Sequence, residues 1–274
     1  VRLSGDLLAT LFRVNLGILV RDIQYSLQKS SKRKKFFSIK VLAKSTLFSH
    51  RVESAIATGS WTGERSGITQ NIDKTNYLAT ISQLQRVSSM LPGDQENFMA
   101  RTLHPTHYGR FCPIETPEGT EIGLRKNLAI LARVSTRVEL DESKFMKDLE
   151  SLELNKEDIG NYDVFFNGMF IGTVNDGNKF VKQIREKRRE NQLPVQMSFR
   201  EDEGIKTIYI STESGRVLRP LIIVENGTSK LKSEHLVQIE QGEIKWKDLI
   251  EKGIIEYLDA AEEENALVAL NEES

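Results

Sequence analysis

The chain has 274 residues, of which 28% are charged and 39% hydrophobic, and its formal net charge at pH 7 is −1. This balance creates no global field that would draw the chain to nucleic acid, so any such contact has to come from local patches. A single cysteine, Cys112, excludes an internal disulfide framework and a cysteine-based zinc site. The longest apolar stretch, residues 7–20, is broken by Arg13 and Asn15 and is too short to span a bilayer. We therefore expect no membrane partner, and we recognise no signal peptide.

The beginning of the chain predicts helix. Residues 3–27 place apolar side chains at helical spacing, and Ser4 is the expected N-cap. A basic run at residues 29–35 follows, and such runs are usually solvated loops. Further helices are predicted over residues 45–58 and 75–86.

Two loops separate or follow these helices. Residues 59–67 contain three glycines, and residues 89–97 contain the turn signal Pro92-Gly93. Both loops are poor in apolar residues and are expected to be mobile, because they have little to bury.

From about residue 130 the pattern predicts strands. A strand is expected at residues 129–138 and a short helix at 145–152. Asn167-Gly168 joins strands 163–166 and 169–174 in a predicted hairpin. A helix is predicted at residues 178–190, with Phe180, Val181 and Ile184 facing inward.

The last part of the chain predicts more strands. Residues 195–199 and 205–211 should pair as a second hairpin. A strand at 216–225 contains Pro220, which predicts an edge or a bulge. A helix over 246–252 should end at Gly253, before a strand at 254–257. The predicted fold class is α+β, with a helical first half and a smaller, strand-rich, mixed α/β second half.

Residues 101–128, RTLHPTHYGRFCPIETPEGTEIGLRKNL, contain three prolines and three glycines. So many turn-forming residues exclude one helix or one strand and predict a chain of fixed turns that presents polar groups. His104, His107, Cys112, Glu115 and Glu118 are of metal-ligand type, but Pro105 argues against a helical ligand face. We favour histidines that brace the turns by hydrogen bonds and expect no metal here.

The same residue types are compatible with two other kinds of chemistry. Glu115 and Glu118 could form a general acid–base pair. A metal-assisted hydrolase could be built on His104, His107 and Glu118, and metal analysis of the purified chain would decide it.

A polar run precedes that segment. It consists of Gln70, Asp73, Asn76, Gln83, Arg86 and Ser88. Because it contains few large apolar residues, it must face water or a polar partner, and the pattern alone leaves both open. Basic residues are dispersed through the same region and suit a phosphate backbone, although some will pair with glutamates instead. They are Arg65, Arg86, Arg101, Arg110, Arg125 and Lys126.

The string at 101–128 closely resembles the most recognisable segment of the second-largest subunit of multisubunit DNA-directed RNA polymerases, nearest the archaeal form. Residues 57–89 resemble the fork region of that family, and residues 2–23 resemble the last helix of its protrusion domain. Three later segments, 164–174, 214–227 and 254–270, resemble its two external domains in the same order. The resemblance implies a piece of a larger subunit.

The resemblance also implies a domain plan. Residues 1–52 would be the C-terminal part of the protrusion, 53–130 the fork, 131–217 external domain 1 and 218–274 external domain 2. The chain would form one wall of the active-site cleft of a nucleotidyltransferase and would be inert alone. No catalytic residue is expected in it. Magnesium would be held by the largest subunit, which is an expected partner together with other polymerase subunits, the DNA template and the RNA–DNA hybrid.

The residues expected to face nucleic acid are Gln70, Asp73, Arg86, Ser88, Arg101 and Glu118. The resemblance places loop 59–67 near the upstream part of the hybrid and loop 89–97 where downstream DNA strands separate. Gln83 stands where the bacterial pattern has a histidine, which argues against rifampicin binding. The implied location is the cytoplasm, or the nucleus in a eukaryote. The alternative is a free-standing nucleic-acid-binding or assembly module.

Overall fold

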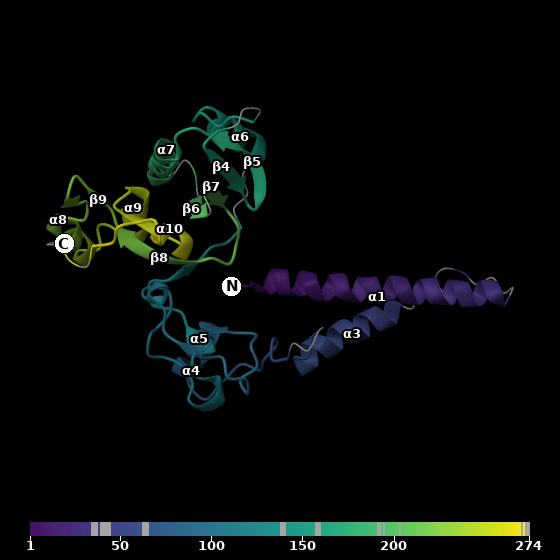
Figure 1. Ribbon diagram of the computed structural model, residues 1–274. Coiled ribbons are helices and arrows are strands. Elements are labelled where there is room, and N and C mark those ends of the chain that lie inside the picture. The colour runs from purple at the N-terminus through teal and green to yellow at the C-terminus, as the bar shows by residue number, and fades with distance from the viewer. Residues whose placement is uncertain are drawn as a thin grey trace. The chain divides into compact units, whose positions relative to one another are not determined.

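The structure, a computed structural model, describes residues 1–33, 38, 45–61, 66–137, 141–156, 160–190, 193, 195–202, 204–269 and 271. The chain divides into two compact units (Figure 1). We call residues 2–98 and 118–125 the helical unit. Val1, residues 99–117 and residues 126–274 form the strand-rich unit. The α+β class is confirmed, with helices first and most strands later. None of the described helices is long and apolar enough to cross a membrane.

The helical unit begins with α1 (Ser4–Lys32), which packs beside α3 (Ser45–Thr58) (Figure 1). Phe12 and Phe48 meet edge to face, with ring centroids 5.4 Å apart. Leu11 of α1 is buried. The range predicted for α3 is confirmed.

Helix α1 corrects two expectations. Its N-cap is Leu3, and no side chain caps it, so the prediction that Ser4 is the cap is wrong: Ser4 is already the first helical residue. The helix also continues through Lys29 to Lys32, so the start of the basic run is helix and not loop. Cations in a last turn offset the negative end of the helix dipole, which favours this extension. Residues 34 and 35 of the run lie outside the described residues.

The third predicted helix is shorter than expected. α4 spans Tyr77–Leu84 because the Asn76 side chain caps it, accepting a hydrogen bond from the Ala79 amide at 2.7 Å. At the other end the chain becomes extended and forms β1 (Arg86–Ser88). The helical unit also contains η2 (Gly119–Glu121), a single 3₁₀ turn.

The two predicted loops have different outcomes. Residues 62–65 of the first loop lie outside the described residues. The second loop, 89–97, contains no helix or strand, as predicted. Its start and its middle nevertheless contact residues 120–124. The Ser89 amide donates to the Leu124 carbonyl at 2.7 Å. Gly93 lies so close to Thr120 that an added Cβ would be 3.1 Å from its carbonyl oxygen. The mobility of both loops stays a prediction.

Two short elements cross the division between the units, α5 (Phe98–Arg101) and β2 (Arg125–Asn127). Within the strand-rich unit, η1 (Pro105–His107) is a 3₁₀ turn in the proline-rich segment. The rest of this unit is built on two sheets.

The larger sheet has the strand order β5-β4-β7-β6. Its strands are β4 (Tyr162–Phe166), β5 (Met169–Val174), β6 (Gln196–Asp202) and β7 (Ile205–Ser211). Both predicted hairpins, β4–β5 and β6–β7, are confirmed as antiparallel pairs, and β4 runs parallel to β7. Asn167 and Gly168 both have positive φ, as this tight turn requires.

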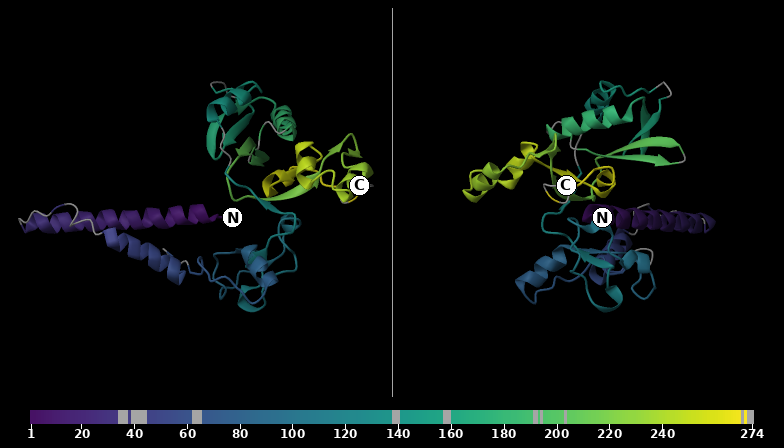
Figure 2. Two further views of the ribbon diagram at one scale, coloured as in Figure 1. Left: turned by 180° about the vertical axis from the view of Figure 1, so that it is seen from behind. Right: turned by 60° about the vertical axis from the view of Figure 1, so that its left-hand side comes forward.

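Two helices pack against this sheet, α6 (Glu142–Glu150) and α7 (Gly177–Arg189) (Figure 2). Phe180 and Ile184 of α7 are buried and Val181 is half-buried, so the predicted inward face is confirmed. The sheet contributes Val164 and Ile208, which are paired neighbours on β4 and β7, to the same core.

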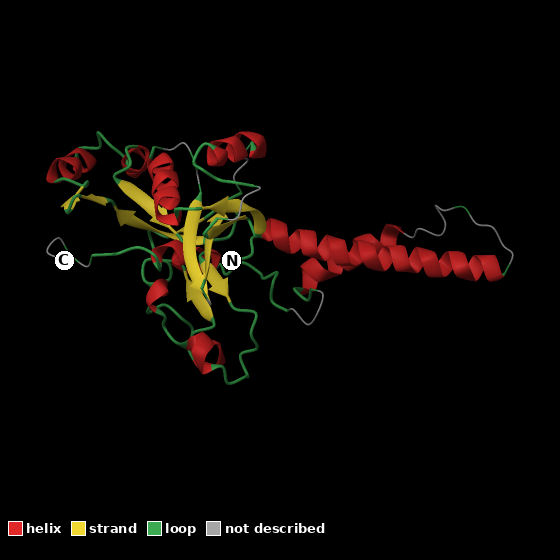
Figure 3. Cartoon of the chain, turned by 45° about the horizontal axis from the view of Figure 1, so that its top comes forward, coloured by secondary structure: helices red, strands yellow, loops and turns green. Residues whose placement is uncertain are grey.

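The smaller sheet has the order β11-β8-β3, with antiparallel neighbours. Figure 3 shows the strands of the chain in yellow and its helices in red. Its strands are β3 (Arg133–Val134), β8 (Val217–Ile222) and β11 (Ile255–Leu258). β8 is the central strand, so an edge position for the whole strand is wrong. β3, however, pairs only with Val217 and Leu218 of β8, so Pro220 has a strand neighbour on one side only, β11. Proline is tolerated at such a position because it has no N–H to donate to a second neighbour.

Short elements complete the strand-rich unit. They are β9 (Val224–Glu225), β10 (Thr228–Ser229), α8 (Ser233–Glu240), α9 (Trp246–Glu251) and α10 (Ala260–Glu263). α9 ends before Gly253, whose φ is +61°, as predicted. α8 and α10 were not predicted. α10 carries Glu262, a buried carboxylate that pairs with Arg188 of α7.

Candidate nucleic-acid interface

The polar run of the helical unit begins as an ordered loop held by two side chains of α4, Gln83 and Thr80. The Gln83 side-chain oxygen accepts a hydrogen bond from the Asp73 amide at 2.6 Å, and its nitrogen donates to the Asn71 carbonyl at 2.9 Å. The Thr80 hydroxyl donates to the Asp73 carbonyl at 2.5 Å. Residues 71–73 are therefore fixed against α4, although their own side chains are exposed.

Asp73 presents an ionised carboxylate from this loop. Its Oδ1 accepts hydrogen bonds from the Thr75 hydroxyl at 2.7 Å and from the Thr75 amide at 2.9 Å. These two bonds, with a smaller contribution from the charge of Arg86, hold the pKa of Asp73 below its ordinary value. The structure thus brings Asp73 and Arg86 within electrostatic reach of each other.

Arg86 and Ser88 lie two residues apart on β1. Arg86 is half-buried, and its Nε is buried without a hydrogen-bond partner among the described residues. Ser88 is exposed. A buried guanidinium donor with no acceptor is costly.

Gln70 and Glu118 are also exposed in the helical unit. The Gln70 side chain folds back and donates to the Gly67 carbonyl at 2.7 Å. Glu118 occupies the N-cap position of η2 but forms no side-chain capping bond. The carboxylate of Glu118 is therefore exposed and is not used to cap η2.

Arg101 lies in the other unit, as the last residue of α5, and is half-buried. The structure therefore gathers five of the six expected residues in the helical unit and assigns the sixth to the strand-rich unit. Glu115 and Glu118, weighed as an acid–base pair, are divided between the units in the same way.

His104 and His107 brace a turn by hydrogen bonds, as predicted. The His104 amide donates to Nδ1 of His107 at 3.3 Å, and the Thr106 amide lies 3.3 Å from Nδ1 of His104. Burial, and then the charges of Lys126 and His104, lowers the pKa of His107. Across the described part of the chain, no group of three or more His, Cys, Asp or Glu side chains is placed to hold a metal ion.

Arg110 corrects the expectation of a basic channel. Only 2% of it is exposed, and it donates to the carbonyls of Thr106, Val217 and Leu258 at 2.9–3.1 Å. It also pairs with Glu263 at 2.6 Å. Arg110 is therefore a structural residue that joins the turn segment to β8 and β11, and it is too buried to reach a phosphate.

The other dispersed basic residues differ among themselves. Arg125 forms paired hydrogen bonds to Glu121 at 2.7 and 3.2 Å, so it braces η2. Lys126 is half-buried, its Nζ is 3.5 Å from the Ala100 carbonyl, and burial lowers its pKa. Arg65 lies outside the described residues.

Comparison with known proteins decides the family. The model described as RNA polymerase Rpb2, domain 3, matches residues 70–134; those for domains 4 and 5 match residues 164–225 and 246–274. DNA-directed RNA polymerase subunit Rpo2 of Sulfolobus acidocaldarius is 41% identical over 287 residues, which include 99% of this chain and 26% of that protein. The chain belongs to the family of RNA polymerase second-largest subunits.

Other relatives refine the assignment. Rpo2N of Methanocaldococcus jannaschii is 46% identical over 154 residues, which cover 56% of this chain and 30% of the relative. DNA-directed RNA polymerase II subunit RPB2 of Encephalitozoon cuniculi is 32% identical over 281 residues, covering 98% of this chain and 24% of the relative. Identity to the archaeal subunits is higher, so the chain is of the archaeal type, as its sequence indicated. It spans 24–30% of the length of these relatives.

Proposed function

We propose that this part of the second-largest subunit forms one wall of the active-site cleft of a DNA-directed RNA polymerase. The reaction of such an enzyme is templated phosphodiester formation from nucleoside triphosphates. The observation that carries the proposal is the succession of three matched domains in chain order, together with an archaeal relative that aligns with nearly the whole chain. In this proposal the domains follow the expected plan, with boundaries near residues 52, 130 and 217.

The role of the chain in this proposal is positioning. Phosphoryl transfer is catalysed largely by alignment and electrostatics, and a polar loop fixed by Gln83 suits that task. Gln70, Asp73, Arg86, Ser88, Arg101 and Glu118 face the RNA–DNA hybrid or the downstream DNA. Loop 89–97 lies where the downstream strands separate, and loop 59–67 lies near the upstream hybrid.

The residue types suggest distinct contacts. Arg86 and Arg101 suit phosphates, which a guanidinium can hold through paired donors. Asp73 is ionised at neutral pH because its pKa is lowered, and a carboxylate repels phosphate. It therefore accepts hydrogen bonds from ribose hydroxyls or base amino groups, as does Glu118.

Other subunits complete the enzyme in this proposal. The largest subunit holds the magnesium ions, and the described residues of this chain contain no acidic cluster that could replace it. Exposed apolar side chains support docking against partner subunits, since Tyr77, Leu78 and Phe98 are 79%, 77% and 80% exposed. The assembled enzyme acts in the cytoplasm of an archaeal cell.

Two experiments with the same protein test the proposal. The purified chain should incorporate no nucleotide on a primed or promoter template, with or without magnesium. In a lysate of the source cells, an antibody to the chain should recover it from a very large complex that is active in transcription. Recovery only as a free chain would contradict the proposal, and so would template-dependent synthesis by the chain alone.

A further inference from the structure

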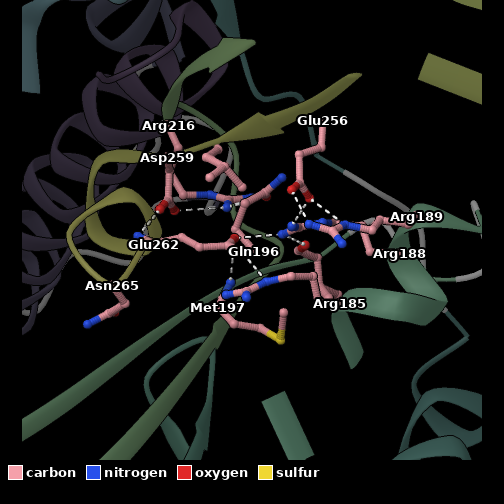
Figure 4. A network of polar contacts seen from close by, with 12 residues as sticks. Arg185, Arg188, Arg189, Gln196, Met197, Arg216, Glu256, Asp259, Glu262 and Asn265 are labelled. Atoms are coloured by element: carbon pink, nitrogen blue, oxygen red, sulfur yellow. Dashed lines mark hydrogen bonds and ion pairs between the residues drawn. The ribbon is translucent and has the colours of Figure 1, made fainter. Parts of the chain in front are cut away.

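A network of ion pairs joins the two sheets of the strand-rich unit (Figure 4). Glu262 on α10 is fully buried and accepts from Arg188 of α7 at 2.6 Å and from the amide of Met197 on β6 at 3.2 Å. Glu256 on β11 accepts from Arg188 at 2.5 Å and from Arg189 at 2.7 Å. The smaller sheet and α10 are therefore fixed to α7 and β6.

The network borders a pocket of about 300 Å³. Leu218 and Ile255, on neighbouring strands of the smaller sheet, form part of an apolar floor. Arg133 of β3 lies opposite Leu218 in the strand register and reaches the same pocket. The end of α7 closes another side, where Gly253 allows close approach: an added Cβ would be 2.9 Å from the Arg189 carbonyl oxygen.

Positive charge exceeds negative charge around this pocket. Among the described residues that line it, the charged ones are four arginines and one carboxylate, Glu256. The arginines are Arg133, Arg188, Arg189 and Arg216. The lining residues also form ion pairs with Asp259 and Glu262, and Glu262 pairs in turn with Arg185. With these residues included, the group contains five guanidinium groups and three carboxylates. Within the described part of the chain, this group therefore has two more guanidinium groups than carboxylates.

Arg133 is the arginine in this group whose charge is available. Arg188 and Arg189 are held by Glu256, and Arg216 donates to Gln196 at 2.5 Å and to Asp259 at 3.3 Å. Arg133 is exposed, and its side chain forms no hydrogen bond or ion pair with any residue in the ranges that the structure describes. An exposed guanidinium beside an apolar floor is a receptor for a carboxylate that is attached to an apolar group.

We propose that this pocket binds a short acidic and apolar segment of a partner polypeptide. A side-chain carboxylate of that segment would pair with Arg133, and a neighbouring aliphatic or aromatic side chain would cover Leu218 and Ile255. The proposal uses none of the residues of the candidate nucleic-acid interface and does not depend on it. A nucleic-acid strand fits less well, because the floor is aliphatic and Tyr257 is the aromatic side chain among the described lining residues.

The test uses the whole 274-residue chain and an end-blocked, fluorescein-labelled hexapeptide of sequence Ser-Glu-Phe-Asp-Leu-Ser. Fluorescence anisotropy should show saturable binding of this peptide. Its neutral counterpart, with Gln and Asn in place of Glu and Asp, should bind about tenfold more weakly, because a charge-assisted hydrogen bond is lost. Arg133→Glu should weaken binding of the acidic peptide by at least about tenfold and leave the neutral peptide unaffected.

The control is Lys144→Glu, which makes the same charge change at an exposed position of α6 and should preserve binding. Circular dichroism of each variant shows that the fold is retained, as expected for changes at exposed side chains. Equal binding of the two peptides, absence of binding, or an Arg133→Glu variant that binds normally would overturn the proposal. Displacement of the acidic peptide by an eight-nucleotide oligothymidylate at lower concentration would also overturn it, in favour of nucleic acid.

Discussion

The side-chain oxygen of Gln83 lies 2.6 Å from the backbone nitrogen of Asp73. The amide nitrogen of the same side chain donates to Asn71, so one residue satisfies a donor and an acceptor of the loop that carries Asp73. The direction of the Asp73 carboxylate is therefore set by α4 and by Thr75, before any partner binds. Such preorganisation is what a positioning surface requires.

Replacing Gln83 should loosen this loop. Gln83→Leu removes both hydrogen bonds at similar size, and we expect a loss of about 1–2 kcal/mol in the free energy of unfolding of the helical unit. Gln83→Glu keeps the acceptor and loses the donor, so its effect should lie between those of wild type and Gln83→Leu. Urea unfolding followed by Trp61 fluorescence, in a Trp246→Phe background, measures the difference. Identical curves for all three proteins would show that Gln83 does not hold the loop.

The arginines of the candidate interface should matter more for nucleic acid than for folding. In an assembled polymerase, Arg86→Ala or Arg101→Ala should lower the salt dependence of elongation-complex stability by about one unit of slope, as expected for one lost phosphate contact. Arg137→Ala, an exposed arginine of the strand-rich unit, is the control and should keep the wild-type slope.

The melting temperature of the same arginine variants separates the two roles. A small change in melting temperature with a lower slope supports a phosphate contact. A variant that melts many degrees earlier but keeps the wild-type slope would reassign its arginine to the scaffold, where Arg110 already belongs.

The buried carboxylate of Glu262 should be essential to the strand-rich unit. Glu262→Gln leaves Arg188 and Arg185 short of a counter-charge, and removing one partner of a buried ion pair costs about 3–5 kcal/mol. Trp246 fluorescence in a Trp61→Phe background would follow the unfolding of this unit. Glu264→Gln, two residues along and exposed, should change stability by less than about 0.5 kcal/mol. Equal effects of the two substitutions would contradict the network.

Acid should weaken the same unit through Glu256. Burial opposes the charge of this carboxyl, but hydrogen bonds from Arg189 and Arg188 and their charges outweigh it, so the pKa of Glu256 is lowered. A lowered pKa means that the native state binds fewer protons than the unfolded chain. The contribution of ionised Glu256 to the free energy of unfolding is therefore fully present above the pKa of the unfolded chain, about 4.3. It is lost as the pH falls through the lower pKa of Glu256 in the native state.

The variant Glu256→Gln isolates that contribution. It should be less stable than wild type at pH 7, and the difference should shrink as the pH is lowered from about 5 to 3. The exposed residue Glu234 offers the comparison, since Glu234→Gln should follow the wild-type pH profile. Denaturant midpoints at five pH values provide the data. A constant difference between Glu256→Gln and wild type across that range would contradict the role of Glu256.

Local signals predicted much of this fold. Asn167, Gly168 and Gly253 have positive φ, a backbone conformation that few other residue types adopt readily. These few residues were therefore enough to predict the β4–β5 hairpin and the end of α9. The inward face of α7 followed from its period. The site was harder: the exposure of Asp73 was foreseeable from its polar surroundings, but the clamp by Gln83 joins residues ten apart and has no local signature.

The ion pairs could not be predicted either, because they join residues that are even farther apart in the sequence and have no local signature. Arg110 and Glu263 are 153 positions apart, and Arg188 and Glu262 are 74 apart. Arg110 shares its residue type with arginines that could face a phosphate, so only the tertiary fold distinguishes them. The acidic run before Asn265 gave no hint of the buried Glu262, because glutamates are mostly exposed and such a run ordinarily predicts a solvated face.

The most direct test of the central claim places a photoreactive phenylalanine at Ser88 in the assembled polymerase. Irradiation of an elongation complex with labelled template and RNA should crosslink this position to nucleic acid, because Ser88 is exposed on β1 beside Arg86. The same photoreactive residue at Lys144 of α6 should not crosslink. Equal crosslinking at both positions, or none at Ser88 in a complex that extends RNA normally, would contradict the account.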